Sequence, residues 1–181
     1  ISEDYIKFIF PCGLDTLKTA KKMPIWEERA AKAIVENILF KPKRDDIESN
    51  LKGGIQVNIQ ALFKDEKNNY IFDNDLNLLD YADEHHPVLI LVNKVKELLT
   101  LNAQETVIEL YQKLTPLFQP PYGLYGNPIS YAAMAIALRP YIDKLFIANN
   151  GTKVDKTLMR DIIEHLFKAA NGGKVHSYLS L

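Results

Sequence analysis

The sequence predicts a mainly α fold with a small β component. Apolar residues recur at the helical period of 3.6 residues in several long segments, and prolines, glycines and capping residues mark where those segments begin and end. Only short stretches alternate at the two-residue period of a strand. The 181 residues are 47% hydrophobic and 25% charged, which is enough apolar surface for one core or for two small cores that share an interface.

The first predicted helix follows Pro24, because proline is favoured in the first turn of a helix and apolar residues such as Ile34 then recur at helical spacing. This helix should end before Pro42. The charged stretch 41–54 indicates a connection with room for one short turn of helix. Residues 55–63 begin with strand-like alternation and then lose it, so strand and helix both remain open there.

Residues 73–86 are acidic, with five negative side chains and no lysine or arginine. Four oxygen-bearing side chains match the ligand spacing of a calcium-binding loop: Asp73, Asp75, Asn77 and Glu84. Leu78, however, occupies the position where such a loop needs glycine for a sharp turn. We therefore favour a capped amphipathic helix, with Leu76, Leu79 and Tyr81 partly buried, over a metal site.

From residue 88 the helical pattern is more regular. Residues 88–99 place apolar side chains along one stripe, although VLILV at 88–92, taken alone, is also typical of a buried strand. Asn102 and Glu105 form a capping box that starts a further helix. That helix must stop before Pro120, because proline disfavours helical geometry in the residue that precedes it.

After a joint at 119–127, Pro128 begins an alanine-rich helix that Pro140 should kink or end. LFIANNGTKV, residues 145–154, then predicts a strand with an Asn-Gly turn, and Asp155 caps the last helix. The tail VHSYLSL alternates well enough to pair with LFIA, which would make a small sheet beside the helices. No internal repeat is recognised.

A domain boundary is predicted near His86-Pro87. Residues 1–86 would form a helical or mixed subdomain, and residues 87–181 a helical subdomain with a small terminal sheet. The order of helix, turn, helix and terminal sheet makes a winged-helix arrangement a candidate for the C-terminal half.

Charge and cysteine content exclude several classes of partner. The 22 basic and 23 acidic residues give a formal net charge of -1, so no global field attracts nucleic acid or an anionic membrane. The single cysteine, Cys12, excludes an internal disulfide and fits a reducing compartment. No apolar run approaches the roughly 18 residues of a membrane span, so we predict a cytoplasmic location without a membrane partner. Because the chain begins with Ile1 rather than methionine, we expect a piece of a larger protein.

Familiar catalytic motifs are absent from the sequence, which contains no GxxxxGK[ST], GxGxxG, HExxH or GxSxG. Residues 83–86 supply four possible metal ligands, but adjacent histidines on regular backbone point in different directions. A solvated turn before Pro87 is therefore the favoured interpretation, and His165 is interpreted as structural. We predict no catalytic residue, no metal and no cofactor.

A local excess of basic residues makes nucleic acid a candidate partner. Seven basic residues lie between positions 139 and 174, against four acidic ones. Lys153, Lys156 and Arg160 cluster around the start of the last predicted helix, where side chains and free backbone donors can meet phosphate. An ordinary solvated face shows a similar excess, so that alternative stays open.

The stretch QPPYGLYGNPIS, residues 119–130, joins two predicted helices. Most of its residues act on the backbone, because the prolines stop one helix and the glycines permit turns. Tyr122, Leu124 and Tyr125 are left for recognition and are the candidate partner-binding residues. Aromatic side chains in such a joint more often pack between the joined helices, so we favour a stiff joint over a binding loop.

One segment carries a family resemblance. PPYGLYGNPISYAAMAIALRPYIDKLFIANNGTKV, residues 120–154, leads from a Pro-Tyr-Gly turn into an alanine-rich helix and a short strand. It resembles a segment of large prokaryotic ATP-binding proteins of the phage-defence type, including the BREX ATPases. The resemblance implies an accessory domain outside the nucleotide-binding core. None of that core's phosphate-binding residues has a counterpart here, so it also implies that this chain alone does not hydrolyse ATP.

Three functional hypotheses follow. The first is a non-catalytic, mainly helical accessory or interaction domain of a larger cytoplasmic protein such as a P-loop ATPase, with the rest of that protein as its partner. The second is a nucleic-acid-binding winged-helix module. The third is an enzyme fragment that uses the acidic stretch with His85 or His86.

Overall fold

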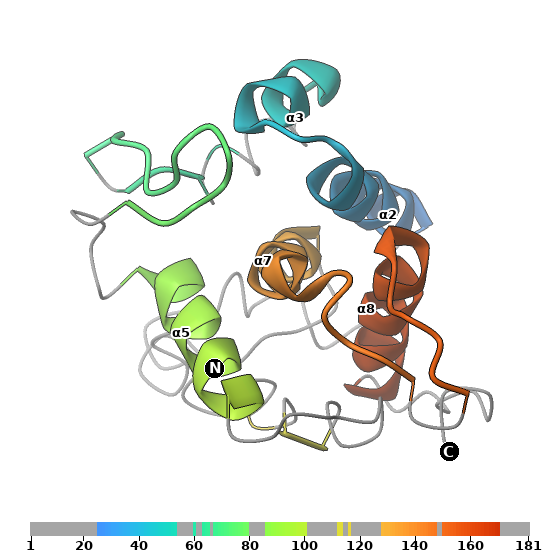
Figure 1. Cartoon of the computed structure of the whole chain (residues 1–181). Coiled ribbons are helices and arrows are strands. Elements are labelled where there is room, and N and C mark those ends of the chain that lie inside the picture. The colour runs from blue at the N-terminus through green and yellow to red at the C-terminus, as the bar shows by residue number, and fades with distance from the viewer. Residues whose placement is uncertain are drawn as a thin grey trace, which may run out of the picture.

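Helix α7 (Pro128–Leu138) lies in the middle of the structure, with α2 (Ile25–Phe40), α5 (Pro87–Thr100) and α8 (Lys156–Ala170) around it (Figure 1). The structure is a computed structural model, and it describes residues 25–53, 60, 63–65, 67–79, 86–100, 112–113, 116, 128–147 and 150–170. A short helix, α3 (Arg44–Asn50), follows α2, and a single 3₁₀ turn, η3 (Arg139–Tyr141), follows α7.

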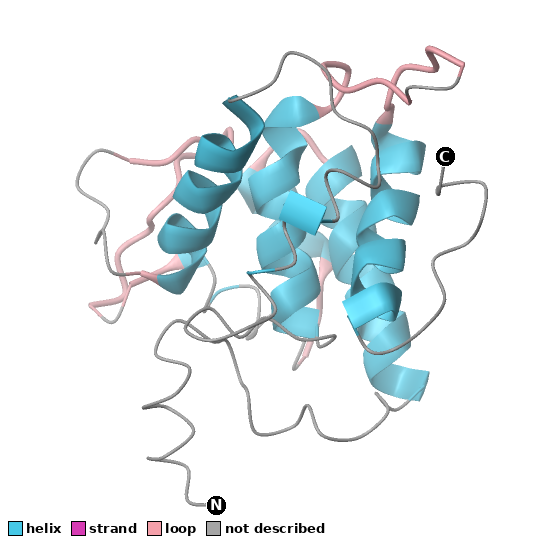
Figure 2. Ribbon diagram, turned by 90° about the horizontal axis from the view of Figure 1, so that it is seen from below, coloured by secondary structure: helices cyan, strands magenta, loops and turns pink. Residues whose placement is uncertain are grey.

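The β component of these ranges consists of isolated bridges, and Figure 2 shows the helices joined by loops and turns. All three bridges are antiparallel and pair Lys64 with Tyr70, Phe72 with Leu78 and Phe146 with Lys153. The predicted class, mainly α with a small β component, is therefore confirmed.

Helix α7 is buried on all sides. Its sequence, PISYAAMAIAL, contains no charged residue, and every side chain from Tyr131 to Leu138 is buried. A helix that is apolar all round is stable in water only when other elements surround it. Its four alanines, Ala132, Ala133, Ala135 and Ala137, are at most 1% exposed, and their short side chains let neighbouring helices approach closely.

Helix α2 packs against α7 through apolar residues that include Ile34 and Ile38, both fully buried. It ends at Phe40, before Pro42, as predicted. Its last carbonyls have no partner within the helix, and the guanidinium of Arg139 binds one of them. Nη1 donates to the carbonyl of Ile38 at 2.6 Å, while Nη2 donates to the carbonyl of Pro42 at 2.9 Å. The end of α7 is thereby tied to the end of α2.

Helix α5 resolves the alternative left open for residues 88–92, which are helical and not a strand. Val88, Val92 and Val95 are buried and lie at helical spacing. His86 precedes this helix, and its Nδ1 accepts the backbone N–H of Val88 at 3.3 Å. Because that nitrogen accepts, the ring proton is on Nε2, which donates to the carbonyl of Lys64 at 3.2 Å.

Pro140 ends α7 at Leu138, as one of the two predicted outcomes for this proline, and the chain turns through η3. Residues 143–147 and 150–154 then form the arms of a short hairpin, the orange link between α7 and α8 in Figure 1. Gly151 has a φ of 64° in the predicted Asn-Gly turn, where glycine adopts the left-handed conformation at little cost. Asp155 caps α8 as predicted, because its Oδ1 accepts the N–H of Leu158 at 2.8 Å.

The buried apolar residues form one cluster. It includes residues of α2, α5, α7 and α8, together with Phe63, Ile71 and Phe72 from the turns between α3 and α5. The ring of Tyr131 on α7 stacks on Phe167 of α8, with centroids 4.2 Å apart. Residues on both sides of position 86 contribute to this cluster, while the predicted division into 1–86 and 87–181 stays a prediction.

Several predicted elements lie outside the described residues. These are most of the helix after Asn102, the joint at 119–127 and the tail strand, so the terminal sheet and the winged-helix arrangement stay predictions.

The burial of α7 generates a stability prediction. Replacing Ala135 with Leu adds volume where no space exists, and we expect the free energy of unfolding to fall by about 1–3 kcal/mol. Urea unfolding followed by circular dichroism measures this change. The matched control is Thr157→Leu at an exposed position of α8, which should change the free energy by less than about 0.5 kcal/mol. Equal effects of the two substitutions would contradict the central position of α7.

Candidate functional site

The three predicted nucleic-acid contacts follow one another from the hairpin into α8. Lys153 lies on the second arm of the hairpin, opposite Phe146, and is exposed. Lys156 is the first residue of α8 and is also exposed. Arg160 lies one turn further along the helix and is half-buried. The structure thus brings the three residues to one region but gives them different surroundings.

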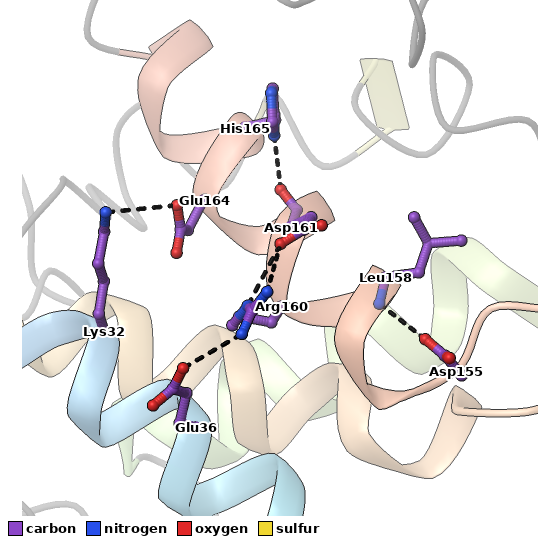
Figure 3. A network of polar contacts seen from close by, with 8 residues as sticks. All are labelled: Lys32, Glu36, Asp155, Leu158, Arg160, Asp161, Glu164 and His165. Carbon is purple, nitrogen blue, oxygen red and sulfur yellow. Dashed lines mark hydrogen bonds and ion pairs between the residues drawn. The ribbon is translucent and has the colours of Figure 1, made fainter.

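Arg160 is engaged in ion pairs within the chain (Figure 3). Its Nη1 donates to Glu36 of α2 at 3.2 Å, and its Nη2 and Nε donate to Asp161 at 3.2 Å. Burial lowers the pKa of the guanidinium, but the hydrogen bonds and charges of Asp161 and Glu36 outweigh this effect and raise the pKa overall. Arg160 therefore links α8 to α2, and its charge is largely balanced by two carboxylates.

A second ion pair lies along the same contact. Lys32 of α2 is 3.8 Å from Glu164 of α8, so residue numbers rise along one helix as they fall along the other (Figure 3). The two helices are therefore antiparallel. His165, on the same helix, is buried, and its Nδ1 lies 2.7 Å from the carbonyl of Asp161. A carbonyl only accepts, so Nδ1 carries a proton and bonds to the helix backbone, which agrees with the structural interpretation of this histidine.

The hairpin presents one apolar and one polar face. Ile147 and Val154 point to the core and are buried, whereas Phe146 and Lys153, which alternate with them, are exposed, as is Lys144 in the preceding turn. The side chain of Phe146 is 50% exposed, although it lies in the middle of the bridge. Sequence reasoning missed this residue, because the apolar run LFI gives no sign of which side chain faces outward.

The candidate partner-binding residues Tyr122, Leu124 and Tyr125 lie outside the described residues, as do Cys12 and residues 83–85. Their assignment stays a prediction.

The interpretation of the acidic stretch as an amphipathic helix is wrong for residues 73–79. Phe72 pairs with Leu78 across a tight turn, and Leu76 takes a positive φ of 64° at its tip. Asp73 holds the turn, because its Oδ1 accepts the N–H groups of Asp75 and Asn77 and its Oδ2 accepts the Asn77 amide at 3.0 Å. Local hydrogen bonds to the aspartate carboxylate compete with helix formation and form in its place here.

The same turn occurs eight residues earlier, although no repeat was recognised from the sequence. Asp65 Oδ1 accepts the N–H groups of Lys67 and Asn69, its Oδ2 lies 3.3 Å from the Asn69 amide, and Asn68 has a positive φ of 66°. Aspartate followed four residues later by asparagine is the signal that the two turns share. The paired turns make a small antiparallel meander, whose described residues are 63–65 and 67–79.

The meander is attached to α3 and to Lys43 before it by polar contacts. Arg44 donates to the carbonyl of Phe72 at 2.8 Å and lies 3.6 Å above the ring of Tyr70. Asn74 accepts the backbone N–H groups of Arg44 and Asp45, and Lys43 forms an ion pair with Asp75. Three of the side chains that match the calcium spacing, Asp73, Asp75 and Asn77, thus form contacts within the chain, and Glu84 lies outside the described residues. Within the described ranges, no three His, Cys, Asp or Glu side chains gather in a group suited to a metal.

Comparisons with known proteins add no assignment: no family model matches the chain, and neither curated proteins nor solved structures yield a match. Among the helices that the structure describes, none has the length and apolar character needed to cross a membrane.

The Arg160 ion pair makes a testable prediction about stability. Arg160→Ala and Glu36→Ala, measured alone and together, should show a coupling of about 0.5 kcal/mol, because partly exposed ion pairs contribute at that level. Urea unfolding of the four proteins measures the coupling. Lys156→Ala, at an exposed position one turn earlier, is the control and should show no coupling to Glu36→Ala. Strictly additive effects of Arg160→Ala and Glu36→Ala would contradict the link between α8 and α2.

The paired aspartate turns predict a pH dependence. Hydrogen bonds from Asn69 lower the pKa of Asp65, and those from Asn77 lower the pKa of Asp73, below the ordinary value of 3.8. A lowered folded-state pKa adds stability that is present above the unfolded value and lost as pH falls through the folded value. We expect the double variant Asp65→Asn/Asp73→Asn to lose less stability than the wild type when the pH drops from 5 to below about 3.

Urea unfolding across this pH range provides the measurement. Asp46→Asn, which removes an exposed carboxylate of α3, serves as the control and should leave most of the pH dependence in place. If the double variant and the wild type have the same acid dependence, the two turns do not hold ionised aspartates.

Proposed function

We propose that this chain is a non-catalytic helical accessory or interaction domain of a larger cytoplasmic protein, and that this protein is a P-loop ATPase of the kind that residues 120–154 resemble. Its main partner is then the rest of the same protein. The resembling segment carries the proposal, and its position in the fold supports it.

That segment supplies the centre of the domain. Within it, the described residues form α7, η3 and the hairpin, and the eight residues from Tyr131 to Leu138 are all buried. A likeness confined to a surface loop can be shared by unrelated folds. A likeness in the central helix is more informative about the fold. The other helices pack around it, and the volume of each core side chain constrains its neighbours.

The use of arginine within the chain also supports an accessory role. Arg44, Arg139 and Arg160 each donate to a carbonyl or carboxylate of a neighbouring element. Arginine is the side chain best suited to clamp a nucleotide phosphate, and these three act as internal links instead.

The test is a comparison of ATP hydrolysis by this chain and by the complete protein that contains it. The 181-residue chain should show no turnover above buffer, and the complete protein should hydrolyse ATP through a P-loop outside this chain. Replacing the P-loop lysine in the complete protein should abolish turnover, while Thr157→Leu in this chain serves as a neutral control. Turnover by the isolated chain, or a complete reading frame without a nucleotide-binding motif, would overturn the proposal.

A second candidate function is nucleic-acid binding by a winged-helix module. The observation that favours it is the exposure of Lys153 and Lys156 where the hairpin meets α8. Arg160 does not support it, because Glu36 and Asp161 already bind its guanidinium. The direct test of this candidate is salt-dependent binding of oligonucleotides by the full chain.

A further inference from the structure

The outward face of the hairpin combines one aromatic ring with several lysines. Phe146 and Lys153 are directly opposite each other across the bridge, and Lys144 lies two residues before Phe146, in the turn that leads into the hairpin. Lys156 follows at the first position of α8. We call this set, Lys144, Phe146, Lys153 and Lys156, the hairpin face. All four side chains are exposed.

Backbone hydrogen bonds and buried side chains hold the hairpin face in place. The N–H of Asp143 donates to the carbonyl of Val154 at 2.9 Å, and the N–H of Val154 donates to Leu145 at 2.8 Å. Val154 itself is 1% exposed and Ile147 is 9% exposed, so the opposite face is anchored in the core. The exposure of the Phe146 ring is therefore not caused by an unanchored segment of chain. The ring is held outward because Ile147, which follows Phe146, and Val154, which follows Lys153, are buried on the opposite face of the hairpin.

The composition of the face suits one class of partner better than others. Protein interfaces usually offer a continuous apolar patch, whereas here a single exposed aromatic ring lies opposite one lysine, and two further exposed lysines are near in the sequence. Proteins that bind single-stranded nucleic acid combine these two elements, because a base stacks on the ring while lysines neutralise the phosphates on either side. A duplex keeps the faces of its bases inside the stack, where an exposed ring cannot reach them.

We propose that the hairpin face binds single-stranded nucleic acid, with a base stacked on Phe146 and phosphates contacted by Lys144 and Lys153. Lys156 extends the track of positive charge toward α8. This inference rests on the second candidate function, nucleic-acid binding, and specifies its ligand and its residues. It does not depend on the accessory role in an ATPase.

Nearby carboxylates limit the strength of the interaction. Asp143 and Asp155 lie beside the face, and the three lysines leave a local excess of one positive charge. The carboxylate of Asp155 accepts the N–H of Leu158 and is thus directed to the helix backbone (Figure 3). We therefore expect binding that is detectable at low salt and lost as the salt concentration rises.

The experiment uses the full 181-residue chain and a fluorescein-labelled oligo(dT) of roughly 12 nucleotides, within the site size of small single-strand-binding modules. Fluorescence anisotropy at about 50 mM salt gives the affinity. Phe146→Ala should weaken binding roughly fivefold or more, the effect of losing one stacked base. Phe40→Ala is the matched control: this ring is 42% exposed but ends α2 and is not on the hairpin, so its loss should leave the affinity unchanged.

A salt titration distinguishes the contribution of the lysines to binding from that of the aromatic ring. Lys153→Gln should reduce the slope of log K against log salt by about 0.7, the contribution of one phosphate contact in a single strand. Phe146→Ala should leave that slope as it is in the wild type. Circular dichroism and thermal unfolding establish that each variant is folded before its affinity is compared.

Different results would overturn the inference and the function on which it rests. If Phe146→Ala binds oligo(dT) as the wild type does, or if a duplex of the same length binds more tightly, the inference fails and nucleic-acid binding stands. If neither oligonucleotide binds at low salt, both fail. If polyglutamate of equal charge competes as well as unlabelled oligo(dT), the face recognises acidic protein segments and the inference fails.

Discussion

The structure depends on the burial of one uncharged helix on all its sides. A lone helix with the sequence of α7 would expose an apolar surface in every direction, so α2, α5 and α8 must each cover part of it. Its alanines set the distance of these neighbours, because a small side chain brings the backbones of packed helices closer. The rings of Tyr131 and Phe167 stack on each other between α7 and α8.

Around this apolar centre, polar side chains mainly connect elements that are far apart in the sequence. Arg139 binds carbonyls at the end of α2, Arg160 binds Glu36, and His86 joins the start of α5 to the meander. Each of these contacts satisfies a donor or an acceptor near a helix end or a helix contact, where an unsatisfied group is costly. These three basic residues therefore bind groups within the chain, so a count of basic residues does not measure the positive charge of the surface.

The helix ends could be predicted from the sequence because residues close by determine them. The surroundings of the candidate site residues were harder to predict because they depend on contacts between residues far apart in the sequence. Pro42, Pro140 and Asp155 act on the backbone within a few residues, and the structure has their helix ends and caps where the sequence indicates them. Asp161 is next to Arg160 in the sequence, but the other carboxylate partner, Glu36, lies 124 residues away, so no local pattern indicates the link between α8 and α2. The exposure of Phe146 depends on which face of the hairpin meets the core, and a continuous apolar run leaves that register open.

Lys156 and Arg160 lie one turn apart on α8 and have different surroundings, because Lys156 is exposed whereas Arg160 binds Glu36 and Asp161. Arg160 contacts Glu36 of α2, and Asp155 caps the first turn of α8. Val154, directly before Asp155, is buried in the core and anchors the hairpin there. A ring carried on such a support loses little conformational freedom when a base stacks on it, because its backbone is already ordered before binding. In the proposed complex, Arg160 therefore has a structural role, the link between α8 and α2, while the buried Val154 anchors the hairpin face.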